Sequence, residues 1–578
     1  MGDGGKGTEA GQVVLTDKQL GEILLARGLI NRTQLESALA EHRKRGVPLG
    51  QILVGRKLIT QRDLGLALQD QLGIKFVDLS TYIVDPVVAA MLPEKVVRQH
   101  QCLPLDWDEE ASVLTVATAN PLDLHALQAV KLASGLKVQT VLVEEPELVR
   151  KIDEFFDVKK DALQAIEDSA NQGDGSASPS LRELEAQVDE APVVRLVNSV
   201  LTSAVASAAS DIHIEPTASD SVVRFRVDGQ LQHHIGVPRR LHAAVISRVK
   251  IMSGMDIAER RLPQDGRIGV IIRGHEIDMR VSSLLTVHGE KVVLRILDKA
   301  TVLRSMGDLG LLPNQVELLR WMMRKPYGMI LVTGPTGSGK TTTLYTVLNE
   351  LNQLTKNIVT VEDPVEYEIA GLNQTQINEA AGITFANQLR AILRQDPNII
   401  LVGEIRDLET AEISIQSALT GHLVFSTLHT NDAPSALIRL LDMGIEPFLS
   451  ASSVIGVVAQ RLVRVICSEC RETYKAEPGV ILSLGATEEQ AKDAVLARGQ
   501  GCPRCNWTGF KGRTALYEIM PVSNPVRRLV LSRASSADIR QEAISLGMMQ
   551  MRDVGLVRIL AQITTPEEVA GAAYIDSE

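Results

Sequence analysis

A glycine-rich turn between an apolar run and a helical segment constrains this chain more than any other feature. Residues 329–344 read MILVTGPTGSGKTTTL, where four apolar residues predict a buried parallel strand and Lys340 is expected to open a helix. The turn fits the pattern G-x-x-x-x-G-K-S/T, whose glycines bring backbone N–H groups against phosphate oxygens. A phosphate-binding loop is therefore predicted, and its residues are Gly334, Pro335, Thr336, Gly337, Ser338, Gly339, Lys340, Thr341 and Thr342.

Two side chains of this loop carry specific expectations. Lys340 is expected to reach the β and γ phosphates of a nucleotide, and the Thr341 hydroxyl is expected to hold Mg²⁺. A chance glycine turn is the alternative, but a chance turn would not require a strand, a loop and a helix in this order.

The length and charge of the chain limit its organisation. At 578 residues it is too long for one hydrophobic core, so three to five domains are expected. The net charge of −11 argues against a general nucleic-acid binder. No run of about 18 apolar residues is present, and residues 1–11 lack the apolar core of a secretory signal. A cytoplasmic protein without a transmembrane segment is expected.

Residues 12–72 contain an internal repeat with an offset of 29 positions. Gly21 and Ile30 of the first copy recur as Gly50 and Ile59 of the second. Each copy has the apolar spacing of a helix, so the repeat predicts a small helical unit made of two similar pieces. A packed helical bundle with no ligand is a competing interpretation of the same pattern.

The remaining patterns predict a multidomain chain of mixed α/β and α+β class. Short strands and helices between residues 76 and 156 predict a small α/β subdomain, and the polar run NQGDGSASPS at 171–180 predicts a linker. Alternating strands between 209 and 297 predict an α+β lobe. The predicted parts are an N-terminal helical and α/β domain (1–158), a linker (159–187), a small lobe (188–305), the phosphate-loop core (306–465), a cysteine subdomain (466–515) and a C-terminal helical region (516–578).

Polar side chains follow three apolar strands after the loop. The strand at 357–366 ends in carboxylates that include Glu366, the strand at 398–404 ends in Glu404, and the strand at 423–427 leads to His429. Parallel α/β sheets place ligands at the carboxyl ends of their strands. Nucleotide chemistry with Mg²⁺ requires one carboxylate to orient the metal's water shell and another to position the attacking water.

Four cysteines predict a structural metal site. Cys467 and Cys470 form one C-x₂-C pair, and Cys502 and Cys505 form another, with 31 residues between the pairs. Four thiolates at this spacing suit a closed tetrahedral Zn²⁺ site. Redox cysteines are the alternative, but they would need one reactive pair rather than two matched pairs.

Taken together, these residues resemble the secretion ATPases of type II secretion and type IV pilus assembly. The motifs that carry the resemblance cover about residues 190 to 570 in the order of that family. They are ASDIHIEP (209–216), RRLPQDGR (260–267), VEDPVE (361–366), LRQDPNIILVGEIRD (393–407), TGHLVFSTLHTND (420–432), QRLVR (460–464) and GRTALYEI (512–519).

The resemblance implies a fold and a set of roles. The fold is a RecA-like ATPase core preceded by a PAS-like α+β lobe, assembled as a homo-hexamer with nucleotide between the two lobes of a protomer. Glu366 is the residue implied to polarise water, and Glu404 is implied to act at Mg²⁺ together with Thr341. The remaining implied positions are the arginine fingers Arg280 and Arg295, the phosphate-sensing arginines Arg390 and Arg394, and the histidine box of His422 and His429; Leu285 stands where the family usually has proline.

The N-terminal repeat is similar to a module that binds cyclic di-GMP in some pilus-assembly ATPases. The 29-residue offset and Gln71 agree with that module, whereas Gln19 and Pro48 stand where its arginines are expected and His42 replaces its first terminal glutamine. Lys57 also replaces a glycine, and Arg27, Arg32 and Lys57 are candidate replacements for the lost arginines. Cyclic di-GMP binding and a purely structural docking repeat therefore both remain open.

The resemblance implies a motor that hydrolyses ATP and acts on an inner-membrane platform protein, with peripheral attachment to the inner membrane. Pilus assembly is the first interpretation, and type II secretion is the alternative. A nucleic-acid translocase competes with both, although the acidic charge argues against it. A second-messenger receptor with a degenerate motor is a third possibility, which the complete set of Lys340, Thr341, Glu366 and Glu404 disfavours.

Overall fold

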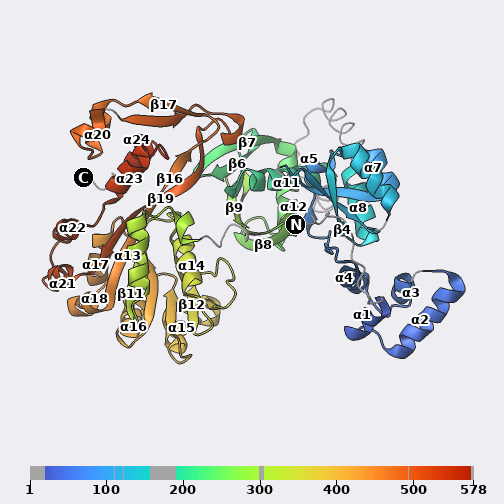
Figure 1. The fold of residues 1–578 in the computed structure, drawn as a ribbon, viewed down its shortest axis with the longest axis horizontal. Coiled ribbons are helices and arrows are strands. Elements are labelled where there is room, and N and C mark those ends of the chain that lie inside the picture. The colour runs from blue at the N-terminus through green and yellow to red at the C-terminus, as the bar shows by residue number, and fades with distance from the viewer. Residues whose placement is uncertain are drawn as a thin grey trace, which may run out of the picture. The chain divides into compact units, whose positions relative to one another are not determined.

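The computed structural model describes residues 20–47, 49–109, 111–121, 123–156, 191–298, 305–492 and 494–573. The chain divides into two compact units, residues 1–299 and residues 300–578 (Figure 1). The predicted linker at 159–187 lies outside the described residues. Each unit is mixed α/β, so the predicted multidomain class is confirmed.

The first unit opens with a helical bundle that reproduces the sequence repeat. A Cβ on Gly21 would lie 2.7 Å from Leu35 Cδ1, and a Cβ on Gly50 would lie 2.6 Å from Leu64 Cδ1. The two copies therefore use the same close approach between a glycine and a leucine. The helices are α1 (Leu20–Ala26), α2 (Arg32–Arg45), α3 (Leu49–Gly55) and α4 (Gln61–Leu72), so α3 and α4 follow α1 and α2 by the repeat offset.

A small α/β part follows the bundle. Its strands form a three-stranded sheet in the order β2-β3-β4, with β2 antiparallel and β4 parallel to β3. The elements are β1 (Tyr82–Ile83), α5 (Pro86–Ala89), α6 (Glu94–His100), β2 (Cys102–Asp108), β3 (Val113–Thr118), α7 (Leu124–Ser134), β4 (Lys137–Leu142) and α8 (Glu145–Phe156).

A seven-stranded sheet, in the order β1-β8-β9-β10-β5-β6-β7, forms the second half of this unit. Its apolar face packs against α11 and α12, which Figure 1 shows beside the sheet. The elements are α11 (Ala191–Ala206), β5 (Ala209–Pro216), β6 (Asp220–Val227), β7 (Gln230–Pro238), α12 (Arg239–Met252), β8 (Gln264–Ile272), β9 (His275–Thr286) and β10 (Gly289–Asp298).

One strand of this sheet comes from the α/β part. β1 pairs in parallel with β8, although about 190 residues separate them along the chain. An ion pair of 2.7 Å between Arg273 and Asp85 reinforces the pairing, and the Gly274 N–H donates to the Tyr82 hydroxyl at 3.1 Å. The α/β part and the small lobe therefore share a sheet, which the sequence patterns did not indicate.

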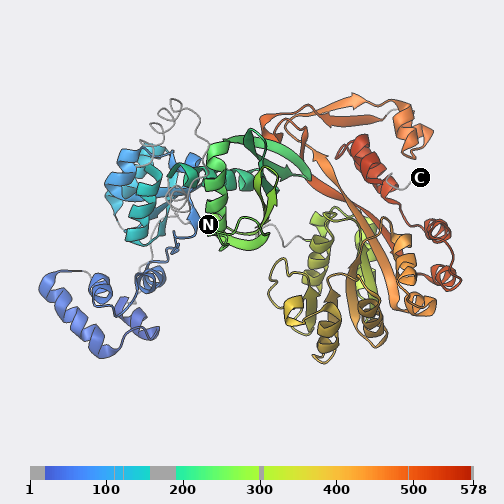
Figure 2. The ribbon, with the colours of Figure 1, turned by 180° about the vertical axis from the view of Figure 1, so that it is seen from behind.

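The second unit contains a seven-stranded sheet in the order β13-β12-β14-β15-β11-β16-β19. All its neighbouring pairs are parallel except β16 with β19. Helices cover both faces, as the two opposite views show (Figures 1 and 2). The elements to β15 are η2 (Met306–Leu309), α13 (Pro313–Met323), β11 (Gly328–Thr333), α14 (Lys340–Leu351), β12 (Ile358–Glu362), β13 (Asn373–Gln376), η3 (Glu379–Ala381), α15 (Phe385–Ile392), β14 (Ile399–Val402), α16 (Leu408–Leu419) and β15 (Leu423–Leu428).

The apolar strand β11 explains why both faces are covered. Met329 and Leu331 belong to the core under α15–α18, whereas Ile330 and Val332 belong to the core under α13 and α14. Alternate residues thus bury on opposite faces, as a strand covered on both sides requires. The remaining elements are α17 (Ala433–Asp442), α18 (Pro447–Ser453), β16 (Val454–Ile466), β17 (Arg471–Lys475), α19 (Pro478–Ser483), α20 (Glu488–Lys492), β18 (Val495–Gly499), η4 (Pro503–Cys505), β19 (Phe510–Pro521), α21 (Asn524–Leu531), α22 (Ser536–Ser545), α23 (Met551–Leu560) and α24 (Pro566–Ala573).

Candidate nucleotide site and cysteine cluster

The predicted phosphate loop connects β11 to α14, and the helix begins at Lys340 as predicted. Gly334, Gly337 and Gly339 have φ values of 149°, 79° and 89°, which side chains rarely adopt. A Cβ on Gly334 would also lie 2.5 Å from the Gln460 carbonyl oxygen. Glycine is therefore needed at this position for both backbone angle and space. The exposed residues of the loop are Pro335, Thr336, Gly337, Thr341 and Thr342.

Polar atoms inside the loop fit a bound phosphate. The Lys340 ammonium donates to the carbonyls of Gly334 at 2.8 Å and Pro335 at 3.1 Å, so the lysine folds back over the loop. Burial lowers the pKa of Lys340, although the nearby Glu404 carboxylate opposes this shift. The Ser338 hydroxyl is buried without a hydrogen-bond partner among the described residues. An anion in the loop would supply the acceptor that this hydroxyl lacks.

Parallel pairing brings the carboxyl ends of β12, β14 and β15 to the same edge of the sheet as the end of β11, where the loop begins. β15 lies between β11 and β14, so the residues that follow β14 and β15 come close to the loop. His429 Nε2 lies 3.5 Å from Glu404 Oε2, and Arg406 forms an ion pair with the same carboxylate. Glu404 is only 15% exposed, so it is a shielded carboxylate beside the loop lysine.

A buried network fixes the turn that carries Glu366. The Glu366 N–H donates to the Tyr345 hydroxyl at 3.3 Å, and this hydroxyl donates to the Glu362 carboxylate. Glu362 also accepts from the Thr360 hydroxyl at 2.5 Å and from the Gln374 amide at 3.3 Å. Burial raises the pKa of Glu362, although these hydrogen bonds oppose the shift. Glu362 is therefore a structural acceptor, whereas Glu366 is half-buried one turn further along.

Three other predicted site residues make contacts that do not involve the phosphate loop. Arg390 pairs with Glu409 at 2.6 Å, and Arg394 donates to the Arg390 carbonyl at 3.0 Å. His422 precedes β15 and its ring nitrogen lies 2.9 Å from the Ser417 carbonyl oxygen. His422 and His429 therefore stand at opposite ends of one strand, about 20 Å apart. Only His429 belongs to the edge that carries the loop.

The predicted arginine fingers belong to a row of arginines in the first unit. Arg280 of β9 lies directly opposite Arg295 of β10 on one side and Arg267 of β8 on the other. Arg295 in turn lies opposite Asp211 of β5, and its Nε is 3.1 Å from Asp211 Oδ1. Like charges directly opposite one another destabilise a sheet. An anion facing this row would offset that repulsion.

Some of these residues were not predicted as site residues. Arg267 stands in register with the predicted fingers, and this register was not available from the sequence. Arg406 follows Glu404 by two positions, so the charge next to the predicted carboxylate was a usable signal. Gln460 donates to the Ser338 carbonyl at 2.7 Å and supports the loop from β16. The support arises from tertiary packing over 122 residues of sequence.

The four predicted cysteines meet in one cluster. All four sulfur atoms lie within 4.8 Å of one another. The Sγ–Sγ distances are 3.9 Å for Cys467 and Cys502, 3.8 Å for Cys470 and Cys505, and 3.7 Å for Cys502 and Cys505. A tetrahedral site with Zn–S bonds of about 2.3 Å has edges of about 3.8 Å, so the cluster fits Zn²⁺.

Backbone amides support the thiolate form of the cluster. The N–H groups of Cys502 and Gly509 donate to Cys505 Sγ at 3.2 and 3.3 Å, and the Gly501 N–H donates to Cys470 Sγ at 3.3 Å. Burial opposes ionisation of Cys505, but these donors and the neighbouring thiols lower its pKa to about 6. The cluster can therefore present a thiolate near neutral pH.

The N-terminal repeat holds some of its predicted ligand residues in other contacts. Gln19 and Pro48 lie outside the described residues. Arg27 pairs with Asp70 at 2.6 Å, which links the first copy of the repeat to the second. His42 lies 2.7 Å from the Val47 carbonyl oxygen through its Nδ1 atom. Among the described helices of the whole chain, none combines the length and apolar character needed to cross a membrane.

The chain is similar to known secretion and pilus-assembly proteins over nearly all of its length. Residues 186–571 match the family described as Type II/IV secretion system protein, and residues 72–162 match the MshEN domain. The type IV pilus assembly ATPase PilB of Myxococcus xanthus is 42% identical over 560 residues, covering 96% of this chain and 98% of that protein. The type II secretion system protein E of Xanthomonas campestris pv. campestris is 43% identical over 554 residues, covering 95% and 97%.

A solved structure supports the fold. The ATPase DotB of Yersinia pseudotuberculosis aligns with a TM-score of 0.50 at 19% identity, covering 66% of this chain and 93% of that one. With a family match over more than half of the chain and relatives above 40% identity along nearly all of it, the chain belongs to the Type II/IV secretion system protein family.

Proposed function

We propose that this chain is an ATP-hydrolysing motor that drives type IV pilus assembly. The observation that carries the proposal is the edge where Lys340, Glu404 and His429 meet beside a glycine loop that fits a phosphate. A relative of nearly the same length is named a type IV pilus assembly ATPase, which supports the same activity here.

The loop and edge residues have separate roles in this proposal. Bound ATP supplies the phosphoanhydride bond, and Mg²⁺ neutralises charge on its phosphates. With nucleotide bound, Lys340 would exchange the loop carbonyls for phosphate oxygens, and Thr341 and Glu404 would hold Mg²⁺. Glu366 holds the attacking water, and the Tyr345 hydroxyl fixes the turn on which Glu366 stands.

Lys340→Ala tests the proposed activity directly. The substitution removes the charge aimed at phosphate and lies on the sheet's edge, so the fold is retained. We expect loss of ATP hydrolysis with an unchanged circular dichroism spectrum and thermal midpoint. Wild-type protein without ATPase activity under any stimulation by membrane components would contradict the proposal.

Type II secretion is the second candidate function, because a relative of equal coverage and identity is named a type II secretion system protein. The two functions predict different phenotypes for a cell in which the gene is deleted. Deletion of the gene, complemented with wild type or Lys340→Ala, distinguishes them. Loss of surface pili supports the first function, whereas retention of exported enzymes in the periplasm supports the second.

Assembly and location complete the proposal. We place the chain in a homo-hexamer, with the row of Arg267, Arg280 and Arg295 facing nucleotide, and with Arg390 and Arg394 sensing phosphate after rearrangement of their present contacts. An inner-membrane platform protein is the proposed partner, which puts the motor in the cytoplasm at the inner membrane. The cysteine cluster is proposed to hold one structural Zn²⁺.

Cyclic di-GMP binding by the N-terminal repeat stays a prediction from sequence. The match to the MshEN domain covers residues 72–162 and so begins at the last residue of the repeat. Calorimetric titration of the full chain with cyclic di-GMP tests the prediction, with a Gly50 variant as the comparison. No heat at about tens of micromolar ligand would make the repeat a docking module.

A further inference from the structure

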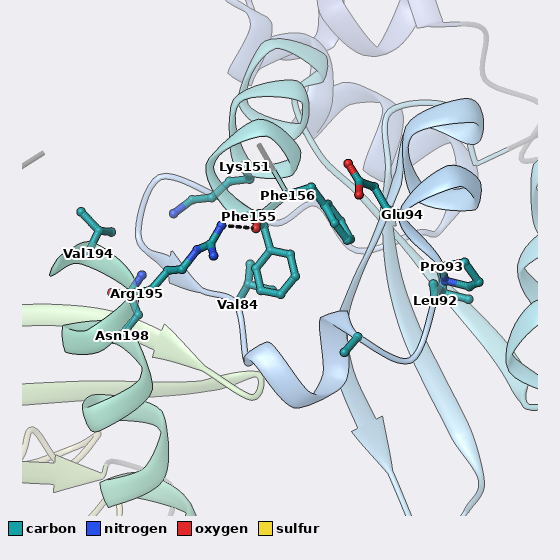
Figure 3. A pocket seen from close by; sticks show the side chains of 11 residues that line it. Val84, Leu92, Pro93, Glu94, Lys151, Phe155, Phe156, Val194, Arg195 and Asn198 are labelled. Carbon is teal, nitrogen blue, oxygen red and sulfur yellow. Dashed lines mark hydrogen bonds between the residues drawn. The ribbon is translucent and has the colours of Figure 1, made fainter. Parts of the chain in front are cut away.

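The first unit contains a cavity of about 370 Å³ that has no role in nucleotide chemistry (Figure 3). The end of α8, the segment from Val84 to Glu94, and the first turns of α11 surround it. Its volume falls in the range of about 300–1,000 Å³ that is usual for small-molecule sites. The apolar part of its wall consists of Val84, Ala90, Leu92, Pro93, Phe155, Phe156 and Val194.

Arg195 places a cation in this apolar wall. One Nη donates to the Phe155 carbonyl at 2.8 Å, whereas the Nε atom is buried and has no hydrogen-bond partner (Figure 3). Among the described residues no carboxylate forms an ion pair with Arg195. The acid of the cavity, Glu94, pairs instead with Arg98 at 2.9 Å. Arg195 is therefore half-buried, with a solvent-inaccessible Nε and no counter-charge among the described residues.

Removing a cation from water without a counter-charge is costly, and burial accordingly lowers the pKa of Arg195. An anion would offset this cost through a charge-assisted hydrogen bond to Nε. The neighbouring side chains of Phe155, Phe156 and Val194 would at the same time exclude water from an apolar group. The charged side chains that line the cavity are Arg195, Lys151 and Glu94, so its wall carries a formal charge of +1, which matches a single negative charge better than a phosphate dianion.

We propose that this cavity is a binding site for a small organic monoanion, a carboxylate attached to a hydrocarbon body. The carboxylate contacts Arg195, and the hydrocarbon body packs on Phe155 and Phe156. The site lies where α8 of the α/β part meets α11 of the small lobe, and it is independent of the nucleotide site proposed above.

Calorimetry on the full-length protein tests the proposal with decanoate and 1-naphthoate as carboxylate probes and decanol as the neutral probe. We expect saturable one-to-one binding of at least one carboxylate and affinity about tenfold lower for decanol, because a hydrogen bond to a charged group is lost. Arg195→Met should weaken carboxylate binding about tenfold and leave decanol binding unchanged. Arg150 is an exposed arginine on α8, and Arg150→Met should change neither carboxylate binding nor decanol binding.

A second pair of variants tests the location. Ala90 is an exposed residue on the rim of the cavity, so Ala90→Trp should fill it and abolish binding without disturbing the core. Val87→Trp adds the same ring to a neighbouring position whose side chain is 68% exposed and outside the cavity. Binding equal in both tryptophan variants would overturn the proposal.

Three further outcomes would also overturn the proposal. Decanol binding as tightly as decanoate would show a hydrophobic site without charge recognition. Carboxylate binding that develops only after residues 160–187 are replaced by a Gly–Ser sequence of equal length would show that the chain's own segment fills the cavity. Absence of binding to both carboxylates, in wild type and in this replacement, would equally contradict the site.

Discussion

Two glutamates at the end of β12 have opposite surroundings, and this difference separates their roles. Three donors already occupy the Glu362 carboxylate, which is 4% exposed. A carboxylate in that position has no room to hold an attacking water. Glu366 lies beyond the strand end and is half-buried, so it is the better candidate for water.

Glu366→Gln should therefore stop hydrolysis while ATP still binds. The substitution keeps the shape of the side chain but removes a proton acceptor, a contribution of about 10²–10⁴-fold in rate. We expect kcat to fall by that factor, with ATP affinity by calorimetry within about threefold of wild type. Normal turnover in this variant would transfer the role to another carboxylate, of which Asp363 is exposed and nearest.

Glu518 gives the second unit a pH-dependent stability. Burial raises the pKa of this carboxyl from 4.5 to about 7, although the Ala433 N–H that donates to it at 2.9 Å opposes the shift. The folded protein thus holds the proton more tightly than the unfolded chain does. The resulting stabilisation is complete below pH 4.5 and is lost as the pH rises through about 7.

Glu518→Gln should remove that dependence, because glutamine accepts the same hydrogen bond and never ionises. The stability difference between the two proteins should shift by on the order of 3 kcal/mol between about pH 4.5 and pH 8, with the variant favoured at the higher pH. Thermal midpoints of both proteins across this range provide the measurement. Parallel curves would show that Glu518 is ionised throughout.

The cysteine cluster joins segments around β17 and β18 whose apolar side chains, such as Ile481 and Leu496, pack into the core of the second unit. β17 and β18 form a two-stranded sheet, and such ribbons are marginal in water without further support. Structural thiolate sites contribute on the order of 10–16 kcal/mol of apparent binding free energy. The fold from Ile466 to Lys511 should therefore depend on the metal.

Cys467→Ser should loosen this subdomain and leave nucleotide binding intact. Limited proteolysis should cut the variant within residues 466–511, and metal analysis should show loss of about one zinc per chain. Cys102→Ser is the matched control, because Cys102 is also buried but lies outside the cluster. A well-folded wild-type preparation without zinc would contradict the assignment.

Local sequence patterns predicted some elements of the fold correctly and missed others. The start of α14 at Lys340 follows from glycine geometry, and the four-helix repeat follows from apolar spacing, because neighbouring residues determine both. The pairing of β1 with β8 depends on contacts between residues about 190 positions apart, which periodicity does not encode. The motif placed His422 and His429 in one group. The two residues lie at opposite ends of β15, and only the carboxyl end of this strand lies beside the phosphate loop.

For the whole molecule, the arginine row and the phosphate loop belong to different compact units. Three arginines lie in register across β8, β9 and β10, and Asp211 lies beside Arg295 at the end of the row. In the homo-hexamer that we propose, Arg280 and Arg295 would face the nucleotide of a neighbouring subunit or of the same subunit. Activity should therefore depend on assembly and on these side chains.

Arg280→Ala and Arg295→Ala should each retain ATP binding to the loop and lower kcat by about 10³-fold or more, the range known for arginine fingers. Arg224→Ala is the control in the same sheet, because Arg224 pairs with Glu215 in a different row. Mixing Arg280→Ala with Lys340→Ala protein distinguishes the geometries. Recovered ATPase activity in the mixture means action between subunits, and no recovery means action within one.

The shared sheet of the first unit also changes how the segment between Phe156 and Ala191 should be regarded. The parts on either side of it are already joined by β1, β8 and the ion pair of Asp85 with Arg273, so their connection does not depend on this segment. Closure entropy grows slowly, by about 0.6 kcal/mol for each doubling of length. A fluorescent reporter inserted after Gly173 should therefore leave the motor working, and would make this protein traceable in living cells without a terminal fusion.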